Sequence, residues 1–440
     1  MPTALIALMS PPLVGPALDQ LPPVYKFAEV ARDHGYDVVW TCSEAMAANV
    51  RRSYPSDQLR TYPNPTFLGT SRLLQPLFRR VLSADIPQRM LPGNPAERNY
   101  EWLFDSYVMV GFDDEAFFFS ATEITLRALA EFTPEFLFTY GCPVGLTAGH
   151  ISGVPVVTFD NLMRLRNDGG ENYKRMNDTV QKAITIFSPV ELPPLPLEDI
   201  VRNERQFRIL STIQHLHRKP YLDNEVFIGG FEPPEATLNF DEKPIKPTVD
   251  GATQTVYASF GSASISHRVV RKVLPAVFDQ VNGLCATPYD CYVSSPFVEK
   301  PYREGPVFFA PLFDAAHIVP HCSYVMSHAG INSVMMALGH GVPLVMTPGA
   351  IQERRHNARE VLSVASGILV EIEDFTVPRL SSILLDRAQE QVLRQNARRT
   401  QQLIIQAGGM RHAFEEMTAR WLAPYDKTRL QTIGHRLELS

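Results

Sequence analysis

Strand-like and helix-like segments alternate from the start of the chain. Ala4–Met9 is an apolar run that ends at two prolines, as a buried strand that stops at a loop would. Val24–His34 has apolar residues at helical spacing, and Gly35 follows as a helix stop. Tyr36–Thr41 is rich in β-forming residues. A strand, a helix and a strand in this order predict a parallel βαβ unit.

The same alternation continues through the rest of the chain. We expect a helix over Glu115–Phe132, a strand over Phe136–Tyr140, a short helix over Gly145–Ser152 and a strand over Val156–Phe159. A polar segment with four prolines, residues 232–254, then reads as a linker, and new βα units begin after it. The pattern predicts two doubly wound α/β domains with a ligand in the cleft between them.

Composition supports a folded protein and argues against several functions. Hydrophobic residues make up 45% of the 440 residues and charged residues 20%, which is ordinary globular composition for two or three domains. The net charge of −6, without a Lys/Arg tract, argues against nucleic-acid binding. The five cysteines lack C-x-x-C spacing, which disfavours a disulfide scaffold or a zinc ribbon. No apolar run reaches the ~18 residues of a membrane span, so we expect a cytoplasmic protein without an integral membrane segment.

The segment from residue 322 to residue 358 carries the most chemistry. A strand-like run to Ser327 is followed by the turn His328-Ala329-Gly330 and by a helix over Ile331–Leu338. Such a turn exposes backbone N–H groups at the positive end of a helix dipole, and Asn332, Ser333 and His328 add side-chain donors. This arrangement is suited to a diphosphate. A plain βαβ turn with capping residues is the alternative on local pattern alone.

This segment resembles the donor-binding region of GT-B glycosyltransferases, in particular the bacterial natural-product branch of the UDP-glycosyltransferase superfamily. The shared motifs are His328-Ala329-Gly330-Ile331-Asn332-Ser333, Gly341-Val342-Pro343, Pro348 and Asn357-Ala358. Upstream, residues 256–262 resemble the strand and Gly-Ser loop that open the family's C-terminal domain, and residues 226–231 the strand before its linker.

The resemblance implies a fold, a division of the chain and a set of site residues. The fold would be α/β of the GT-B type, with two Rossmann-like domains facing across a cleft. The divisions would be an acceptor domain over 1–235, a linker over 236–250, a nucleotide-sugar domain over 251–405 and a helical region over 406–440 that crosses back. The donor diphosphate would be bound by Gly261, Ser262, His328, Gly330, Asn332 and Ser333, the nucleobase by Pro311, Leu312 and Phe313, and the sugar by Gln352 and Glu353.

The reaction implied is the transfer of a sugar, with inversion, from a dTDP- or UDP-activated donor to a small hydrophobic natural-product acceptor. The family needs no metal and no further cofactor, and the chain has no D-x-D pair for a metal–diphosphate site. Aromatic residues within 45–130 are candidates for the acceptor pocket, with core packing as the preferred interpretation for most of them: Tyr54, Trp102, Phe104, Tyr107, Phe117, Phe118 and Phe119.

The sequence departs from the family pattern at the general base. The family has a His in its first loop, whereas this chain has Asp19 and Gln20 there, and Tyr140 stands where an orienting Asp is usual. Asp19 would serve as base if burial raises its pKa, or it is a loop or capping residue. Alternatively the loop holds no base, and the acceptor is already ionised or Asp113 or Asp114 serves. For those two acids, the favoured interpretation is that they are acids at the N-terminus of the helix that follows, just before Glu115.

A second departure lies in the sugar-contact pair. Arg354 follows Glu353 where the family has Gln, so sugar recognition is altered or the loop is one residue out of register. His317 and His321 are spaced as metal ligands on one helix face would be, but Pro320 between them disfavours that interpretation. Two other functions stay open: a nucleotide-sugar epimerase, and an inactive GT-B protein that binds nucleotide sugar or assists a partner enzyme.

Overall fold

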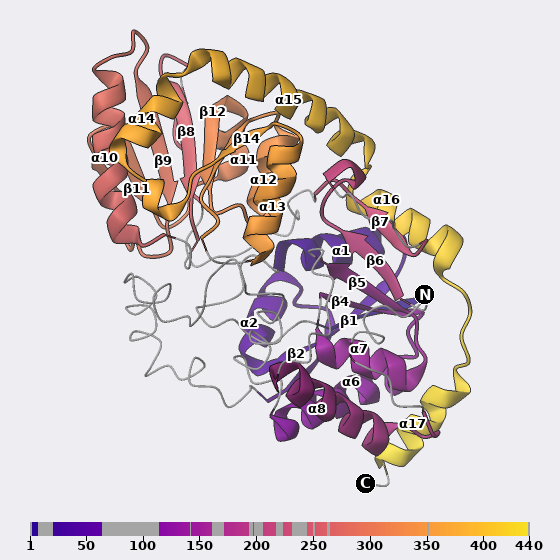
Figure 1. Cartoon of the computed structure of the whole chain (residues 1–440). Coiled ribbons are helices and arrows are strands. Elements are labelled where there is room, and N and C mark those ends of the chain that lie inside the picture. The colour runs from indigo at the N-terminus through magenta and orange to yellow at the C-terminus, as the bar shows by residue number, and fades with distance from the viewer. Residues whose placement is uncertain are drawn as a thin grey trace.

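Two seven-stranded sheets follow one another along the chain in this computed structural model (Figure 1). The structure describes residues 2–7, 21–63, 114–140, 142–160, 171–192, 197, 206–216, 223–230, 244–249, 251–261, 265–349 and 352–438. Among the helices in these ranges, none combines the length and apolar character that a bilayer-spanning segment needs.

The first sheet is entirely parallel and has the strand order β3-β2-β1-β4-β5-β6-β7. Its strands are β1 Thr3–Ala7, β2 Asp37–Ser43, β3 Gln58–Tyr62, β4 Phe136–Tyr140, β5 Val156–Asp160, β6 Gln206–Leu210 and β7 Glu225–Phe227. The helices around it are α1 Leu21–Asp33, α2 Glu44–Ser53, α6 Glu115–Phe132, α7 Pro143–Ser152, α8 Glu171–Phe187 and the 3₁₀ turn η2 Gln214–Leu216.

The second sheet has the order β10-β11-β9-β8-β12-β13-β14, with β10 alone antiparallel to its neighbour. Its strands are β8 Gln254–Ser259, β9 Tyr289–Ser294, β10 Tyr302–Glu304, β11 Val307–Ala310, β12 Cys322–Ser327, β13 Leu344–Met346 and β14 Gly367–Leu369. Its helices are α10 His267–Asn282, α11 Ala315–Ile318, η3 Val319–His321, α12 Ile331–Gly339, α13 Gln352–Ser363, η4 Ile372–Asp374, α14 Val377–Leu385 and α15 Arg387–Gln406.

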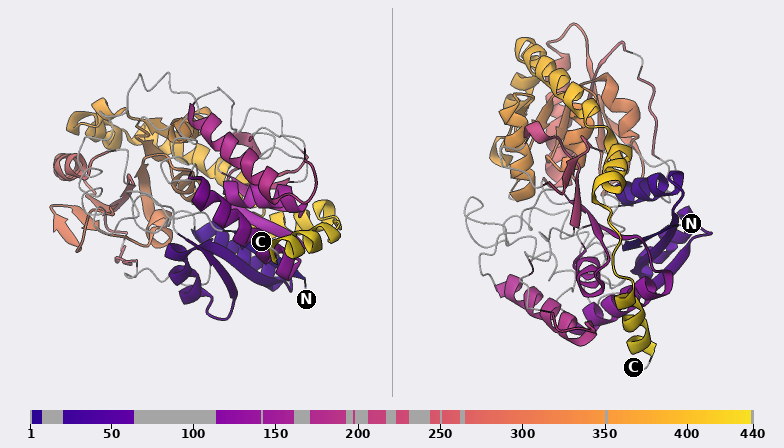
Figure 2. Two further views of the ribbon diagram at one scale, coloured as in Figure 1. Left: turned by 90° about the horizontal axis from the view of Figure 1, so that it is seen from below. Right: turned by 90° about the vertical axis from the view of Figure 1, so that its right-hand side faces the viewer.

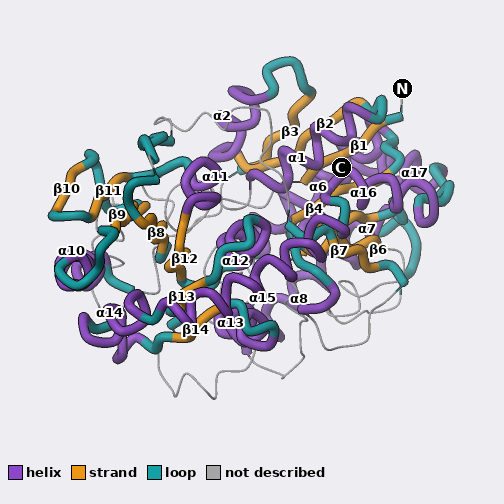
Figure 3. Tube along the Cα trace, turned by 90° about the horizontal axis from the view of Figure 1, so that it is seen from above, coloured by secondary structure: helices purple, strands orange, loops and turns teal. Residues whose placement is uncertain are grey.

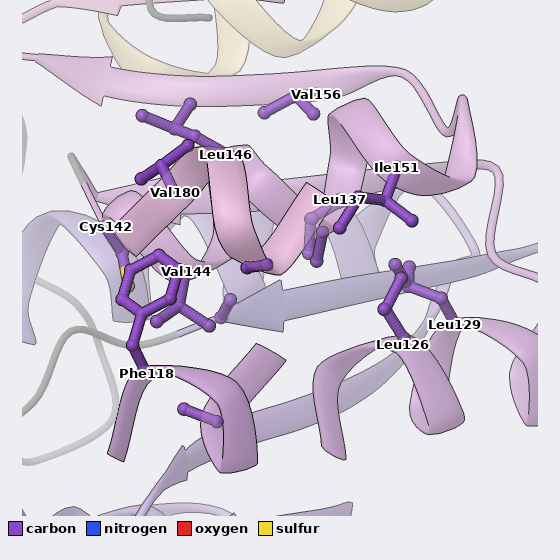
Figure 4. Close-up of a cluster of buried hydrophobic side chains, with 14 of the residues drawn as sticks. Phe118, Leu126, Leu129, Leu137, Cys142, Val144, Leu146, Ile151, Val156 and Val180 are labelled. Atoms are coloured by element: carbon purple, nitrogen blue, oxygen red, sulfur yellow. The ribbon is translucent and has the colours of Figure 1, made fainter. Parts of the chain in front are cut away.

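Both faces of each sheet are covered, as is usual for parallel sheets. Because successive side chains of a strand point to opposite faces, they enter two different cores. In β1, Leu5 and Ala7 join the core under α6, α7 and α8, whereas Ala4 and Ile6 join the core under α1 and α2. Figure 4 shows the first of these cores, where side chains of α6 meet those of α7. In the second sheet the two cores lie under α10 and α14 and under α12, α13 and α15.

The C-terminal helices leave the second sheet and pack on the first. After α15 come α16 Gly409–Glu416, a single π turn η5 Met417–Trp421 and α17 Thr428–Glu438 (Figures 1 and 2). Phe414 is fully buried against Phe27 and Phe136, with ring centroids 5.6 Å and 6.1 Å away. Trp421 packs on Phe207, with ring centroids 5.6 Å apart, so this part of the tail also contacts the first sheet. The expected domain limits at 235 and 250 stay a prediction.

The short segment after β6 also joins the two halves. Leu216 of η2, together with Ile213, lies in the same core as Val334 and Met335 of α12. Residues from the first half of the chain therefore support the helix that opens the candidate donor site. This contact has no counterpart in the sequence pattern, because nothing local marks 213–216 as an interface.

Candidate functional site

The turn between β12 and α12 lies at the carboxyl end of the second sheet, where the strand order reverses. The chain leaves β8 toward β9 and β11 and returns to β12 on the other side of β8. Ligands bind at such switch points in open α/β sheets, because the loops diverge there and leave a crevice. Ser327, the last residue of β12, is paired with Ser259, the last residue of β8, so their two loops start side by side.

The turn itself is held by short-range hydrogen bonds. Ala329 has φ +61°, and its N–H donates to Ser327 Oγ over 3.1 Å. Gly330 is the N-cap of α12, and its carbonyl accepts from Val334 N at 3.0 Å. A turn of α12 therefore begins directly after the left-handed residue, as expected for a loop that presents the start of a helix to a ligand.

The ring of His328 lies between two glycines from the two loops. A Cβ on Gly330 would be 2.6 Å from His328 Nε2, and one on Gly261 would be 3.2 Å from Cε1. Gly261 also has φ +60°, a conformation that L side chains rarely adopt. The structure thus brings together three of the six predicted diphosphate residues around one imidazole. Asn332 and Ser333 follow in the first turn of α12, whereas Ser262 lies outside the described residues.

His328 is neutral, which changes the donor role expected from the sequence. Burial, with the nearby Arg354 charge, lowers the pKa of His328 to about 3, against the opposing effect of its bond to Ser259. The partner of Nδ1 is the carbonyl oxygen of Ser259 at 3.3 Å, which can only accept, so the proton is on Nδ1. Nε2, the nitrogen beside Gly330, then has a lone pair instead of a proton.

The helix α13 packs against α12 and brings the candidate sugar residues to the turn (Figure 3). Glu353 is half-buried in its first turn, and Asn357 Nδ2 donates to Glu353 Oε1 at 2.5 Å. Gln352 is the first residue of α13. Arg354 is near enough to lower the pKa of His328, so its charge acts on the site. Sequence reasoning included Asn357 in a motif but gave it no role.

The candidate nucleobase residues follow β11. Phe313 is buried, its ring packs on Tyr292 at 5.4 Å, and its N–H donates to Ser294 Oγ over 3.0 Å. The carbonyl of Leu312 accepts from Ile245 N at 3.1 Å. The N–H of Phe313 and the carbonyl of Leu312 are therefore both bonded within the protein. Pro311 and Leu312 are half-exposed, whereas Phe313 is buried.

Of the residues considered for the general base and its orienting partner, Asp114 and Tyr140 lie within the described residues. Asp19, Gln20 and Asp113 lie outside the described residues. Asp114 is the N-cap of α6, and its side chain accepts from Ala116 N and Phe117 N at 3.0 and 3.3 Å, which confirms its expected place at the N-terminus of that helix. Tyr140 is 9% exposed and stacks on Phe159 with a centroid distance of 5.3 Å.

Of the aromatic acceptor candidates, the described ones pack in cores. Phe117 and Phe118 are buried in the core of α6 and α7 and Phe119 is partly buried against it, while Tyr54 stacks on Trp40 in the opposite core. Trp102, Phe104 and Tyr107 lie outside the described residues.

The candidate metal ligand His317 interacts through Nε2 with the carbonyl of Pro247 at 3.1 Å. Within the described ranges, no group of three or more His, Cys, Asp and Glu side chains could hold a metal ion.

Comparisons with known proteins found a similarity over part of this region. Residues 317–404 match the sequence model of the UDP-glucoronosyl and UDP-glucosyl transferase family. Aclacinomycin-T 2-deoxy-L-fucose transferase from Streptomyces galilaeus is 29% identical over 103 residues, which is 23% of each chain. The chain thus matches about a quarter of the length of its curated relatives. The predicted resemblance to the UDP-glycosyltransferases is confirmed over this segment, which contains the His328 turn, α12 and α13.

Solved structures extend the likeness to the whole fold. The glycotransferase of kitacinnamycin superposes with a TM-score of 0.67 at 15% identity, covering 96% of this chain and 100% of that one. The glycosyltransferase VinC, solved in complex with dTDP, superposes with a TM-score of 0.62 at 12% identity, covering 99% of this chain and 100% of that one. The predicted fold, two doubly wound α/β halves of the GT-B type, is confirmed.

Proposed function

We propose that this chain is a glycosyltransferase that moves a sugar from a dTDP- or UDP-activated donor to a small hydrophobic natural-product acceptor. The observation that carries the proposal is the turn at the switch point of the second sheet, where Gly261 and Gly330 enclose His328 at the start of α12. The family match over residues 317–404 supports the same assignment. VinC shares the fold and was solved with dTDP, which supports dTDP as the first nucleotide to test.

In the proposed reaction, an acceptor oxygen attacks the anomeric carbon as the bond from that carbon to the diphosphate oxygen breaks. The configuration inverts, and the acceptor proton passes to a base or is lost beforehand from an ionised acceptor. The backbone N–H groups at the start of α12 stabilise the charge that develops on the departing diphosphate. Asp19 is the proposed base in the first loop. A metal ion has no step in this scheme, and no cofactor beyond the nucleotide sugar is needed.

A thermal-shift panel with UDP, dTDP, GDP and their sugar conjugates tests the donor site. A nucleotide at 100 times its dissociation constant should stabilise the protein by about 2.7 kcal/mol, a shift of several degrees. Ser333→Trp, in the first turn of α12, should remove the shift. Ser382→Trp, at an exposed position of α14, is the matched control and should keep it. A folded protein that responds to no nucleotide would contradict the proposal.

Product analysis then distinguishes the functions that share this fold. Free nucleotide together with a new glycoside of configuration opposite to the donor supports an inverting transferase. An isomerised sugar nucleotide without acceptor would indicate an epimerase. Binding without turnover over a broad acceptor panel would indicate an auxiliary protein, and Asp19→Asn should then change nothing. If Asp19 is the base, Asp19→Asn abolishes turnover and spares donor binding.

A further inference from the structure

The side-chain amide of Asn357 joins two parts of the candidate donor site. Asn357 lies on α13, is 3% exposed, and donates from Nδ2 to the carbonyl of Ala329 at 3.0 Å and to Glu353 Oε1 at 2.5 Å. Both partners are acceptors, so the amide must present its NH₂ side, and each of its two N–H bonds has one partner. One nitrogen therefore holds the diphosphate turn and the candidate sugar carboxylate together.

The bond to Ala329 sets the direction of the peptide that opens α12. In a planar trans peptide, the C=O of one residue and the N–H of the next point in opposite directions. Asn357 binds the carbonyl of Ala329 on the α13 side, so the N–H of Gly330 points away from α13. Ala329 is a non-glycine residue at φ +61°, a conformation that persists only where the surroundings hold it.

The bond to Glu353 sets the position of the carboxylate. Glu353 is four residues before Asn357, so the two side chains lie on the same face of α13, one turn apart. A carboxylate fixed by a buried amide has a smaller choice of rotamers than one in solvent, and a carboxylate is an acceptor for sugar hydroxyls. The distance between the two subsites is thereby set through a single residue.

We propose that Asn357 is a positioning residue that aims the Gly330 N–H at the donor diphosphate and the Glu353 carboxylate at the donor sugar. The inference rests on the proposed function, since it assigns a role within the same donor site. Asn357 itself touches neither the diphosphate nor the sugar in this assignment. It acts on both through the two groups that it holds.

The variant Asn357→Asp tests this role with almost no change of volume. It replaces the NH₂ group with an oxygen that faces a carbonyl and a carboxylate, so both bonds are lost and two acceptors repel it. Affinity for UDP or dTDP should fall about tenfold, as expected when a buried acceptor loses its partner. Affinity for the matching nucleotide sugar should fall further, because Glu353 is released as well. Asn357→Ser, which keeps one donor, serves if the Asp variant does not fold.

A second Asn–Ala pair in the same half of the chain provides the control. Asn396 Nδ2 donates to the carbonyl of Ala365 at 3.1 Å, and Ala365 is also left-handed, with φ +49°. Ala365 lies between α13 and β14, and Asn396 lies on α15. Because β12, β13 and β14 run parallel, Ala365 is at the opposite end of the sheet from the His328 turn. Asn396→Asp removes the same kind of bond and should leave both affinities unchanged.

Calorimetric titration of nucleotide and nucleotide sugar into five proteins completes the test: wild type, Asn357→Asp, Asn396→Asp, Glu353→Gln and the double variant at 353 and 357. In the Glu353→Gln background, the Asn357 substitution should weaken nucleotide and nucleotide sugar by the same factor, because the sugar part is already lost. A general loss of stability would not produce this selective coupling. Wild-type protein that binds neither ligand would overturn the proposed function. If the wild type binds both ligands and the affinities of Asn357→Asp equal those of Asn396→Asp, only the role of Asn357 is overturned.

Discussion

Binding of a nucleotide sugar should bring a proton to His328. In the free protein its pKa is about 3, and the single ring proton is on Nδ1, bonded to the carbonyl of Ser259. Nε2 beside Gly330 therefore meets an anionic diphosphate with a lone pair. Protonation of Nε2 converts this repulsion into a charge-assisted hydrogen bond. The anion favours the charged imidazole, so the pKa in the complex lies above that in the free protein.

The size of the effect follows from the two pKa values. If the diphosphate restores only the ordinary His pKa of about 6.5, affinity at pH 5 should exceed that at pH 8 by about 30-fold, or ~2 kcal/mol. Because the pKa of His328 is higher in the complex than in the free protein, binding strengthens as pH falls below about 6.5. The affinity levels off only near pH 3, the pKa of His328 in the free protein.

Isothermal titration calorimetry at pH 6, in buffers of different ionisation enthalpy, counts the proton directly. The ligand should be a nucleotide sugar, because its phosphates are diesters, whereas the terminal phosphate of a free nucleotide titrates near pH 6. We expect uptake of about 0.8 proton per site. His328→Gln should abolish the uptake, and His340→Gln, at the C-terminal end of α12, should retain it. Affinity that is independent of pH with no uptake, or uptake that persists in His328→Gln, would refute the reasoning.

Three further substitutions test other parts of the structure. Gly330→Ala would put a Cβ 2.6 Å from His328 Nε2, so nucleotide affinity in calorimetry should fall at least about tenfold with the fold intact; unchanged affinity would contradict the enclosed ring. Arg354→Gln removes a charge that lowers the pKa of His328, so the pKa followed by NMR of the ring should rise; a fall would show that Arg354 acts otherwise. Phe414→Ala should lower the free energy of unfolding in urea by about 3–5 kcal/mol, whereas Ile405→Ala, at a 62% exposed position, should change it little; equal effects would show that α16 does not stabilise the first sheet.

Elements with a strong local pattern could be predicted almost to the residue. Glu115–Phe132 and Phe136–Tyr140 were both expected from apolar spacing and β-propensity, and both form with those bounds. The turn at His328 was expected from a strand, a glycine and an apolar helix face, and β12 and α12 confirm it. The residues that determine these elements lie within one or two turns of one another, so the local sequence pattern is enough to predict them.

The protonation of His328 and the role of Asn357 depend on residues distant in sequence. His328 is bonded to Ser259, 69 residues away, and its pKa also reflects Arg354. Asn357 reaches Ala329 across 28 residues. The sequence predicted that His328 donates to an anion, and fully so if protonated, whereas in the structure its Nε2 is an acceptor until a proton arrives. Burial and tertiary contacts decide this, and neither is visible in the local pattern.

Within the described residues, the chain leaving the first sheet after β7 lies against the chain returning from the second sheet after α15. A Cβ on Gly229, just after β7, would be 2.5 Å from the carbonyl oxygen of Ile404 and 3.1 Å from Ala407 Cβ, at the end of α15. The outgoing and the returning chain therefore lie in close contact here, as do Ile213 and Leu216 with α12. Sliding one half of the molecule along the other would break the contact at Gly229, whereas a rotation about it would keep it.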